Sequence, residues 1–163
     1  MKKKYILLLV FFIFNTYAYS ASSGGSNDGS SIKINNFKKG SNLIKQAKKY
    51  EKKGKSEKAK KSFSKALKYL LLANKKNPNQ PDTLNYLGFA SRKIGNFENA
   101  EKYYLEGLSI EPNHFGINEY LGELYVNTGR LDKAKERLKV LQNCNCEEFK
   151  ELNNAINSGS SKY

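Results

Sequence analysis

The side chains best suited to covalent chemistry are two cysteines, Cys144 and Cys146, the only cysteines in the 163-residue chain. One residue separates them, so a disulfide between them would close a very small, strained ring that is comparatively easy to reduce. We predict that this disulfide forms and holds the turn in which it lies. A redox-active pair is one alternative, and free or intermolecular thiols are another.

Little else in the chain points to catalysis. His114 is the only histidine and falls in a predicted turn. The sequence has no G-x-S-x-G motif, no phosphate-binding glycine loop and no histidines, cysteines and acidic residues at the spacing of metal ligands. We therefore expect a protein that is not an enzyme and that uses neither a metal ion nor another cofactor.

The N-terminus has the layout of a signal peptide. Lys2, Lys3 and Lys4 form a basic segment, and an uninterrupted apolar run extends from Tyr5 to Phe14. Small residues follow at positions typical of a cleavage site, whereas a helix that spans a bilayer needs about 20 predominantly apolar residues. We expect residues 1–20 to be removed and the mature chain to be periplasmic or secreted. The alternative is a retained N-terminal anchor.

Two further segments are predicted to lack regular structure. Residues 21–40 are rich in Gly, Ser and Asn and contain few apolar side chains. They cannot bury enough surface to offset the loss of chain entropy on folding. We interpret them as a flexible linker, and residues 158–163 as a disordered tail.

The sequence between these segments repeats itself every 34 residues. Gly88 and Gly122 occupy the same slot of two copies, Gly95 matches Gly129, and an earlier copy follows when Gly54 is aligned with Gly95. Apolar residues recur in each copy at the i, i+3, i+4 and i+7 spacing of an amphipathic helix. Gly54, Gly95 and Gly129 lie where the first helix of each copy must end and the chain must turn. Each copy is therefore predicted to be a pair of antiparallel helices.

This pattern resembles the tetratricopeptide-repeat (TPR) family over residues 41 to about 142. We interpret the protein as a small exported bacterial member of it. The resemblance implies an all-α fold, a short α-solenoid of three TPR helix pairs plus a C-terminal capping helix. The TPR domain would span residues 41–157, with repeats at about 41–77, 81–114 and 115–143.

The chain departs from the family pattern in three places. Asn118 stands where a large apolar residue is usual, and Gly107 replaces the customary alanine. The second helix of the first repeat has about two extra turns before Pro78 and is rich in leucine. We expect these turns to cover the N-terminal end of the solenoid.

The capping helix is predicted at about 146–157. Its apolar residues, between Phe149 and Ile156, form one stripe at helical spacing. Asn145, followed three residues later by Glu148, resembles a capping box. This helix would bury the exposed flank of the third repeat.

The family resemblance also implies a ligand site. In TPR proteins, ligands usually lie in the concave groove lined by the first helix of each repeat. The lining implied here has a basic entrance, one exposed aromatic residue and an acidic far end, which suits an extended or helical peptide of matched polarity. The carboxylate clamp of chaperone-binding TPR proteins is not reproduced. The predicted groove residues are Lys48, Glu51, Lys52, Asn85, Phe89, Arg92, Lys93, Glu119, Glu123 and Asn127.

Positive charge is concentrated in the first repeat. The chain has a formal net charge of +14 at pH 7, and residues 41–77 hold thirteen lysines against Glu51 and Glu57. One interpretation is a basic patch that attracts anionic envelope components such as acidic proteins, lipid headgroups or polysaccharide. The other is a solvated face in a chain whose many lysines reflect codon bias. Nucleic acid is not expected, because export argues against it and the lysines carry few interleaved aromatic residues.

The function expected from these features is a non-catalytic scaffold or adaptor of the bacterial cell envelope that binds a protein or peptide partner, and an acidic partner is one option. Contact with a membrane is expected only through an uncleaved signal peptide or a weak attraction to an anionic surface. The alternatives are a thiol-active folding helper that uses Cys144 and Cys146, and the basic-patch binder.

Overall fold

The chain forms a series of helix pairs. A computed structural model describes residues 35–160, so the predicted signal peptide, most of the predicted linker and residues 161–163 of the predicted tail lie outside the described part. The described residues are all-α, as predicted, and contain seven helices. These are α1 (Asn36–Lys52), α2 (Ser56–Lys76), α3 (Pro81–Lys93), α4 (Phe97–Ile110), α5 (Phe115–Asn127), α6 (Leu131–Leu141) and α7 (Glu147–Ser158).

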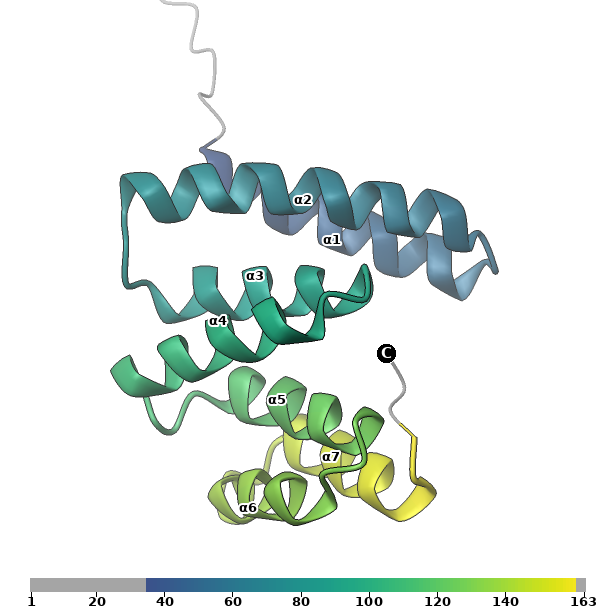
Figure 1. Cartoon of the computed structure of the whole chain (residues 1–163), viewed down its shortest axis with the longest axis vertical. Coiled ribbons are helices and arrows are strands. Elements are labelled where there is room, and N and C mark those ends of the chain that lie inside the picture. Colours follow the sequence, from purple (N-terminus) through teal and green to yellow (C-terminus); the bar gives the residue numbers. More distant parts are fainter. Residues whose placement is uncertain (1–34, 161–163) are drawn as a thin grey trace, which may run out of the picture. The chain divides into compact units, whose positions relative to one another are not determined.

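Successive helices pack as antiparallel pairs, α1 with α2, α3 with α4 and α5 with α6 (Figure 1). Each pair also packs against the next, and α7 packs against both α5 and α6. None of the helices in residues 35–160 combines the length and apolar character that a membrane-crossing helix requires.

The predicted turn glycines adopt the conformation that the repeat requires. Gly54, Gly95 and Gly129 each follow the first helix of a pair and have positive φ angles of 66°, 89° and 72°. A residue with a Cβ atom is strained there. These glycines therefore explain where α1, α3 and α5 end and why the second helix of each pair runs back along the first.

The first helix begins earlier than the sequence predicts. The sequence places residues 36–40 in the flexible linker, but α1 starts at Asn36, so this prediction is wrong for these five residues. The Asn35 side chain caps the helix by accepting a hydrogen bond of 2.8 Å from the Lys38 backbone N–H. Phe37 packs edge-to-face on Tyr86 of α3, at 5.6 Å between ring centroids. The early start therefore depends on a contact with the second repeat.

The C-terminal helix is entered differently from the predicted capping box. Cys146, not Asn145, is the N-cap of α7, and no side-chain hydrogen bond caps the helix. Asn145 has a positive φ of 48°, because it lies in the tight turn between the two bonded cysteines. The body of the helix lies on the third repeat, where Leu152 is fully buried against Gly122 of α5.

Two departures from the family pattern have a packing reason. The side chain of Asn118 is fully buried and donates hydrogen bonds to the backbone oxygens of Pro112, at 3.0 Å, and His114, at 3.1 Å. It therefore fastens the turn between the second and third repeats. Gly107 of α4 leaves room for the Ile117 side chain, which a Cβ atom would overlap.

Gly88 of α3 packs closely against α4. A Cβ atom there would lie 2.6 Å from Cδ1 of Tyr104, a fully buried residue of α4. We expect Gly88→Ala to lower the free energy of unfolding by about 1–2 kcal/mol, because overpacking costs about 1–3 kcal/mol and the better helix propensity of alanine offsets part of it.

Urea unfolding followed by circular dichroism measures this change. Lys102→Ala, on the exposed side of α4, is the control and should leave the midpoint nearly unchanged. A Gly88→Ala variant as stable as the parent would contradict this packing.

Candidate functional site

The candidate site is the face formed by α1, α3 and α5, the first helices of the three pairs, here called the helix-A face. The ten predicted groove residues all lie on these helices. They differ widely in exposure. Lys52 and Asn127 are exposed, Lys48, Glu51, Asn85 and Lys93 are partly exposed, and Phe89, Arg92, Glu119 and Glu123 are buried.

The prediction that these side chains line an open groove is wrong for the four buried residues. Phe89 is 1% exposed, Arg92 4%, Glu119 6% and Glu123 0%. Arg92 pairs with Glu123 and lies over the Phe89 ring, and Glu119 faces Glu123 electrostatically. These four residues are here called the polar layer between the repeats. A ligand on this face would meet the partly exposed residues above them.

An ion pair between α3 and α5 lies at the centre of this layer. Arg92 Nη2 donates a hydrogen bond of 2.7 Å to Glu123 Oε2, and both side chains are almost fully removed from solvent. The other carboxylate oxygen of Glu123 is buried with no hydrogen-bond partner among the described residues. Burial raises the pKa of Glu123, and the Arg92 charge opposes that shift. Removing either partner would therefore leave the other charge buried without a counter-charge.

Lys48 extends the layer to the first repeat. Its Nζ atom lies 4.4 Å from the Phe89 ring centroid and donates a hydrogen bond of 3.1 Å to Tyr120 Oη. The rings of Phe89 and Tyr120 are themselves 4.8 Å apart. Burial lowers the pKa of Lys48, while the carboxylates of Glu119 and Glu123 oppose the shift. One lysine of α1 thus reaches across α3 to α5, 72 residues away.

Glu119 is the second buried carboxylate of the layer. Within residues 35–160, no hydrogen bond or ion pair reaches its side chain, which faces Glu123 and the α7 residues Glu148 and Glu151 electrostatically. Burial, with added repulsion from these carboxylates, raises the pKa of Glu119 to about 8. At neutral pH this group therefore holds a proton most of the time.

The remaining groove residues lie around the layer. Glu51 of α1 forms an ion pair with Lys93 of α3, and both side chains are partly exposed. Asn85 of α3 lies beside Gly116 of α5. The structure therefore brings the predicted residues of the three repeats together. Most of them contact one another, whereas the prediction had them contact a ligand.

Tyr120 is a site residue that the sequence prediction missed. The family's ligand positions do not include its slot, so the resemblance gave no reason to select it. The 34-residue period offered a signal, because Tyr86 occupies the same slot of the second repeat. Both tyrosines contact an aromatic side chain of the preceding repeat, Tyr86 with Phe37 and Tyr120 with Phe89.

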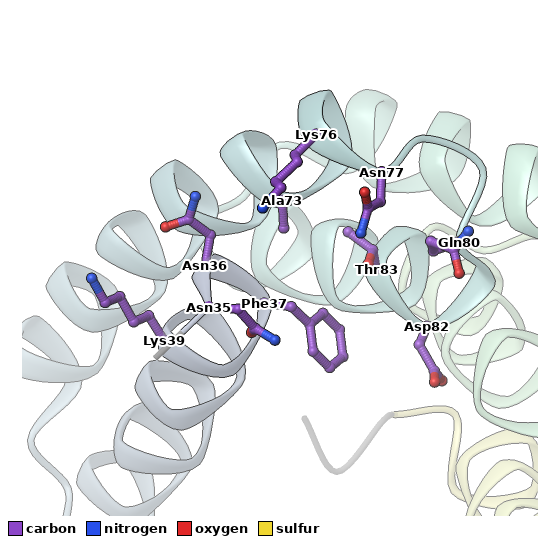
Figure 2. A pocket seen from close by; sticks show the side chains of 10 residues that line it. All are labelled: Asn35, Asn36, Phe37, Lys39, Ala73, Lys76, Asn77, Gln80, Asp82 and Thr83. Atoms are coloured by element: carbon purple, nitrogen blue, oxygen red, sulfur yellow. The ribbon is translucent and has the colours of Figure 1, made fainter. Parts of the chain in front are cut away.

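A polar pocket lies at the end of the first helix pair. It has a volume of about 570 Å³ and lies among the start of α1, the end of α2 and the start of α3 (Figure 2). Two of its polar groups already have partners, since Asn35 caps α1 and Asp82 lies 3.2 Å from His114 Nε2. Its lining is mainly amide and lysine side chains, from Asn35, Asn36, Lys39, Lys76, Asn77 and Gln80.

The two cysteines lie between α6 and α7 and not on the three helices that form the helix-A face. Cys144 and Cys146 are joined by a disulfide in the segment between α6 and α7, with their Cα atoms 5.1 Å apart. Both residues are partly exposed. The thiol-active alternative stays a prediction.

Comparison with known families identifies the family to which the chain belongs. Residues 37–69, which cover α1 and most of α2, and residues 81–114, which cover α3, α4 and the following turn, each match the tetratricopeptide repeat family. The chain is a tetratricopeptide-repeat protein. Its α5–α6 pair continues the same TPR pattern of a first helix, a positive-φ glycine and a second helix.

Similar proteins share only part of this TPR chain or only its general fold. Human protein O-mannosyl-transferase TMTC3 is 34% identical over 64 residues, which are 39% of this chain and 7% of TMTC3. The chain therefore spans a small fraction of that relative.

Two solved structures also resemble this TPR protein. The type III secretion translocator chaperone SycD of Yersinia enterocolitica is 23% identical, with a TM-score of 0.47, over 74% of this chain and 87% of SycD. The second TPR of Spaghetti (RPAP3), solved with an HSP90 peptide, is 17% identical, with a TM-score of 0.43, over 66% of this chain and 93% of that structure.

Proposed function

We propose that this TPR protein is a non-catalytic scaffold that binds a partner protein or peptide across its helix-A face. TPR arrays generally present extended concave surfaces that bind partners. The observation that carries the proposal is the buried layer in which Lys48, Arg92 and Glu123 join all three repeats. A surface whose side chains are held in place by such contacts loses little conformational freedom on binding.

The exposed and partly exposed residues of the face define the partner chemistry. Lys48 and Lys52 make its first-repeat end basic, while the partly exposed carboxylates of Glu148 and Glu151 on α7 make the other end acidic. A peptide with acidic residues toward the first repeat and basic residues toward α7 would match this polarity. The apolar run from Tyr5 to Phe14 supports a site of action in the bacterial cell envelope, as a periplasmic or secreted protein.

The binding test uses exposed positions, because replacing a buried residue such as Phe89 would change stability as well as binding. A photo-crosslinking amino acid at Lys52 would first identify the partner from an envelope extract. We then expect the pair Lys52→Glu and Asn127→Arg, which opposes the proposed polarity at both ends, to weaken the partner's affinity about tenfold or more. Isothermal titration calorimetry on the full chain measures the affinity.

The control pair is Lys102→Glu on α4 and Lys135→Glu on α6, which changes two exposed residues on second helices. This pair should leave the affinity nearly unchanged. Equal affinities for the two pairs of variants would exclude the helix-A face as the binding surface.

A further inference from the structure

The outer face of α2 carries a feature that the helix-A face does not account for. α2 has 21 residues, and seven of them are lysines, whereas Glu57 is its one acidic residue. All seven lysines are exposed. From Asn36 to Lys76, the first helix pair holds fifteen lysines against Glu51 and Glu57, a net charge of +13. Glu51 is already paired with Lys93.

Helical spacing places much of this charge in one line along α2. Positions three or four residues apart share a face of a helix. Such a line, here called the basic stripe, consists of Lys58, Lys61, Lys65, Lys68, Leu72 and Lys75. The opposite face of α2 packs in the core through Ala59, Phe63, Ala66 and Leu70.

Two leucines are exposed within or beside the basic stripe. Leu71 is 47% exposed and Leu72 is 51% exposed. They belong to the extra leucine-rich turns of α2. Leu70 is fully buried and lies directly over Gly40 of α1, so α1 covers that residue and leaves the next two uncovered. The extra turns therefore cover α1 with one leucine and present two to solvent.

We propose that the basic stripe, with Leu71 and Leu72, is an interfacial binding surface for an anionic lipid bilayer. Lysines on such a helix contact lipid phosphates while their aliphatic stems lie along the surface. Leucines between them enter the boundary between headgroups and acyl chains. α2 is about 31 Å long at 1.5 Å per residue, so the whole stripe can lie flat on a bilayer. This binding surface is independent of the helix-A face.

The leucines favour a bilayer over an acidic protein or a nucleic acid. A purely electrostatic partner would use the lysines and gain nothing from two exposed leucines at the end of the helix. The stripe also contains no arginine, the residue that binds phosphate and base edges in a bidentate manner. A mixed surface of lysine and leucine is the composition of helices that lie in the membrane interface.

The test uses a fluorescent reporter in the full chain. The sequence contains no tryptophan, so Leu72→Trp introduces a single reporter on the stripe. Leu105→Trp, on α4 and 49% exposed, is the matched control. With vesicles of phosphatidylcholine and phosphatidylglycerol, we expect a blue shift for Leu72→Trp that disappears at high salt. We expect no shift for Leu105→Trp, or for either variant with phosphatidylcholine alone.

Variants separate the two parts of the surface. Neutralising three stripe lysines, as Lys61→Gln, Lys65→Gln and Lys68→Gln, should reduce partitioning to anionic vesicles about 100-fold. Leu71→Ala with Leu72→Ala should reduce it about tenfold. The control set Lys102→Gln, Lys135→Gln and Lys139→Gln changes exposed lysines of α4 and α6 and should change it less than about fivefold. The apolar run at residues 5–14 is the same in all variants.

Three results would overturn the proposal. Vesicle binding that is unaffected by the two alanines would mean that the stripe attracts anions without entering a bilayer. An equal shift of both tryptophan reporters would mean that the protein adsorbs through another part. Binding of soluble polyglutamate as tight as that of anionic vesicles would identify an acidic polypeptide as the partner.

Discussion

Replacing Arg92 by methionine is expected to lower the free energy of unfolding by about 3 kcal/mol at neutral pH. The reason is the Glu123 carboxylate, which is fully buried and whose pairing oxygen lies 2.7 Å from Arg92. Without Arg92 this carboxylate must either stay charged in the interior or take up a proton. Protonating a carboxylate of ordinary pKa at pH 7 costs about 3 kcal/mol, which sets the scale of the loss.

A double variant distinguishes this cause from lost packing. Arg92→Met combined with Glu123→Met leaves no buried charge at the site, and we expect its unfolding free energy to be within about 1–2 kcal/mol of the parent. The losses of unfolding free energy in the two single variants would then sum to much more than the loss in the double variant. The Arg92→Met variant should also recover at pH 5, where protonating Glu123 costs less than about 1 kcal/mol.

The Arg130–Glu101 pair provides the matched control. It joins α4 to the third repeat at 2.8 Å, but its side chains keep 34% and 23% of their solvent exposure. Arg130→Met should therefore cost only about 1 kcal/mol. Chemical denaturation of Arg92→Met, Glu123→Met, their double variant and Arg130→Met at pH 5 and pH 7 measures all of these differences. A cost for Arg92→Met no larger than that for Arg130→Met would contradict the buried ion pair.

The fold could be predicted from sequence because its signals are local and repeated. One positive-φ glycine, Gly54, Gly95 or Gly129, stands at the turn of each helix pair, and the apolar positions recur at the same spacing. The start of α1 was not predictable in this way. Phe37 is ordered by Tyr86, and Gly40 by Leu70, which lie 49 and 30 residues further along the chain.

Most residues of the candidate site could be predicted from the sequence, but Tyr120 and the exposure of the side chains could not. Family positions indicated that Phe89, Arg92 and Glu123 lie on one face, which is correct. Whether such a side chain is open to a ligand depends on what the neighbouring repeats place above it. Here Lys48 and Tyr120 lie over Phe89, and Glu123 pairs with Arg92. These contacts join residues 31 to 72 positions apart, and no local pattern encodes them.

The stability of the protein is expected to fall as the pH rises from about 5 to 8, and Glu119→Gln is expected to remove much of that fall. The pKa of Glu119 is about 8 in the folded protein, compared with an ordinary value of 4.5. Between these values the folded state binds more protons than the unfolded state. Stability therefore decreases with rising pH in this window.

Glutamine resembles the protonated carboxyl group in shape and carries no charge. At pH 5 we expect Glu119→Gln to be as stable as the parent, since Glu119 is then protonated in the folded state. At pH 8 the variant should be more stable by roughly 3 kcal/mol, the scale of a pKa difference of this size in a group coupled to its neighbours. Thermal unfolding across this pH range measures the change.

Glu136→Gln is the control, because the Glu136 side chain is 68% exposed and should not alter the pH dependence. An unchanged slope in Glu119→Gln would show that its carboxylate is not the group that titrates. A slope reduced only in part would assign the remainder to Glu123 on α5, the other buried carboxylate of the layer, whose pKa burial also raises. The positive charge of Lys48 lowers the pKa of Glu119. Lys48→Met should therefore steepen the fall of stability with rising pH, the same fall that Glu119→Gln removes.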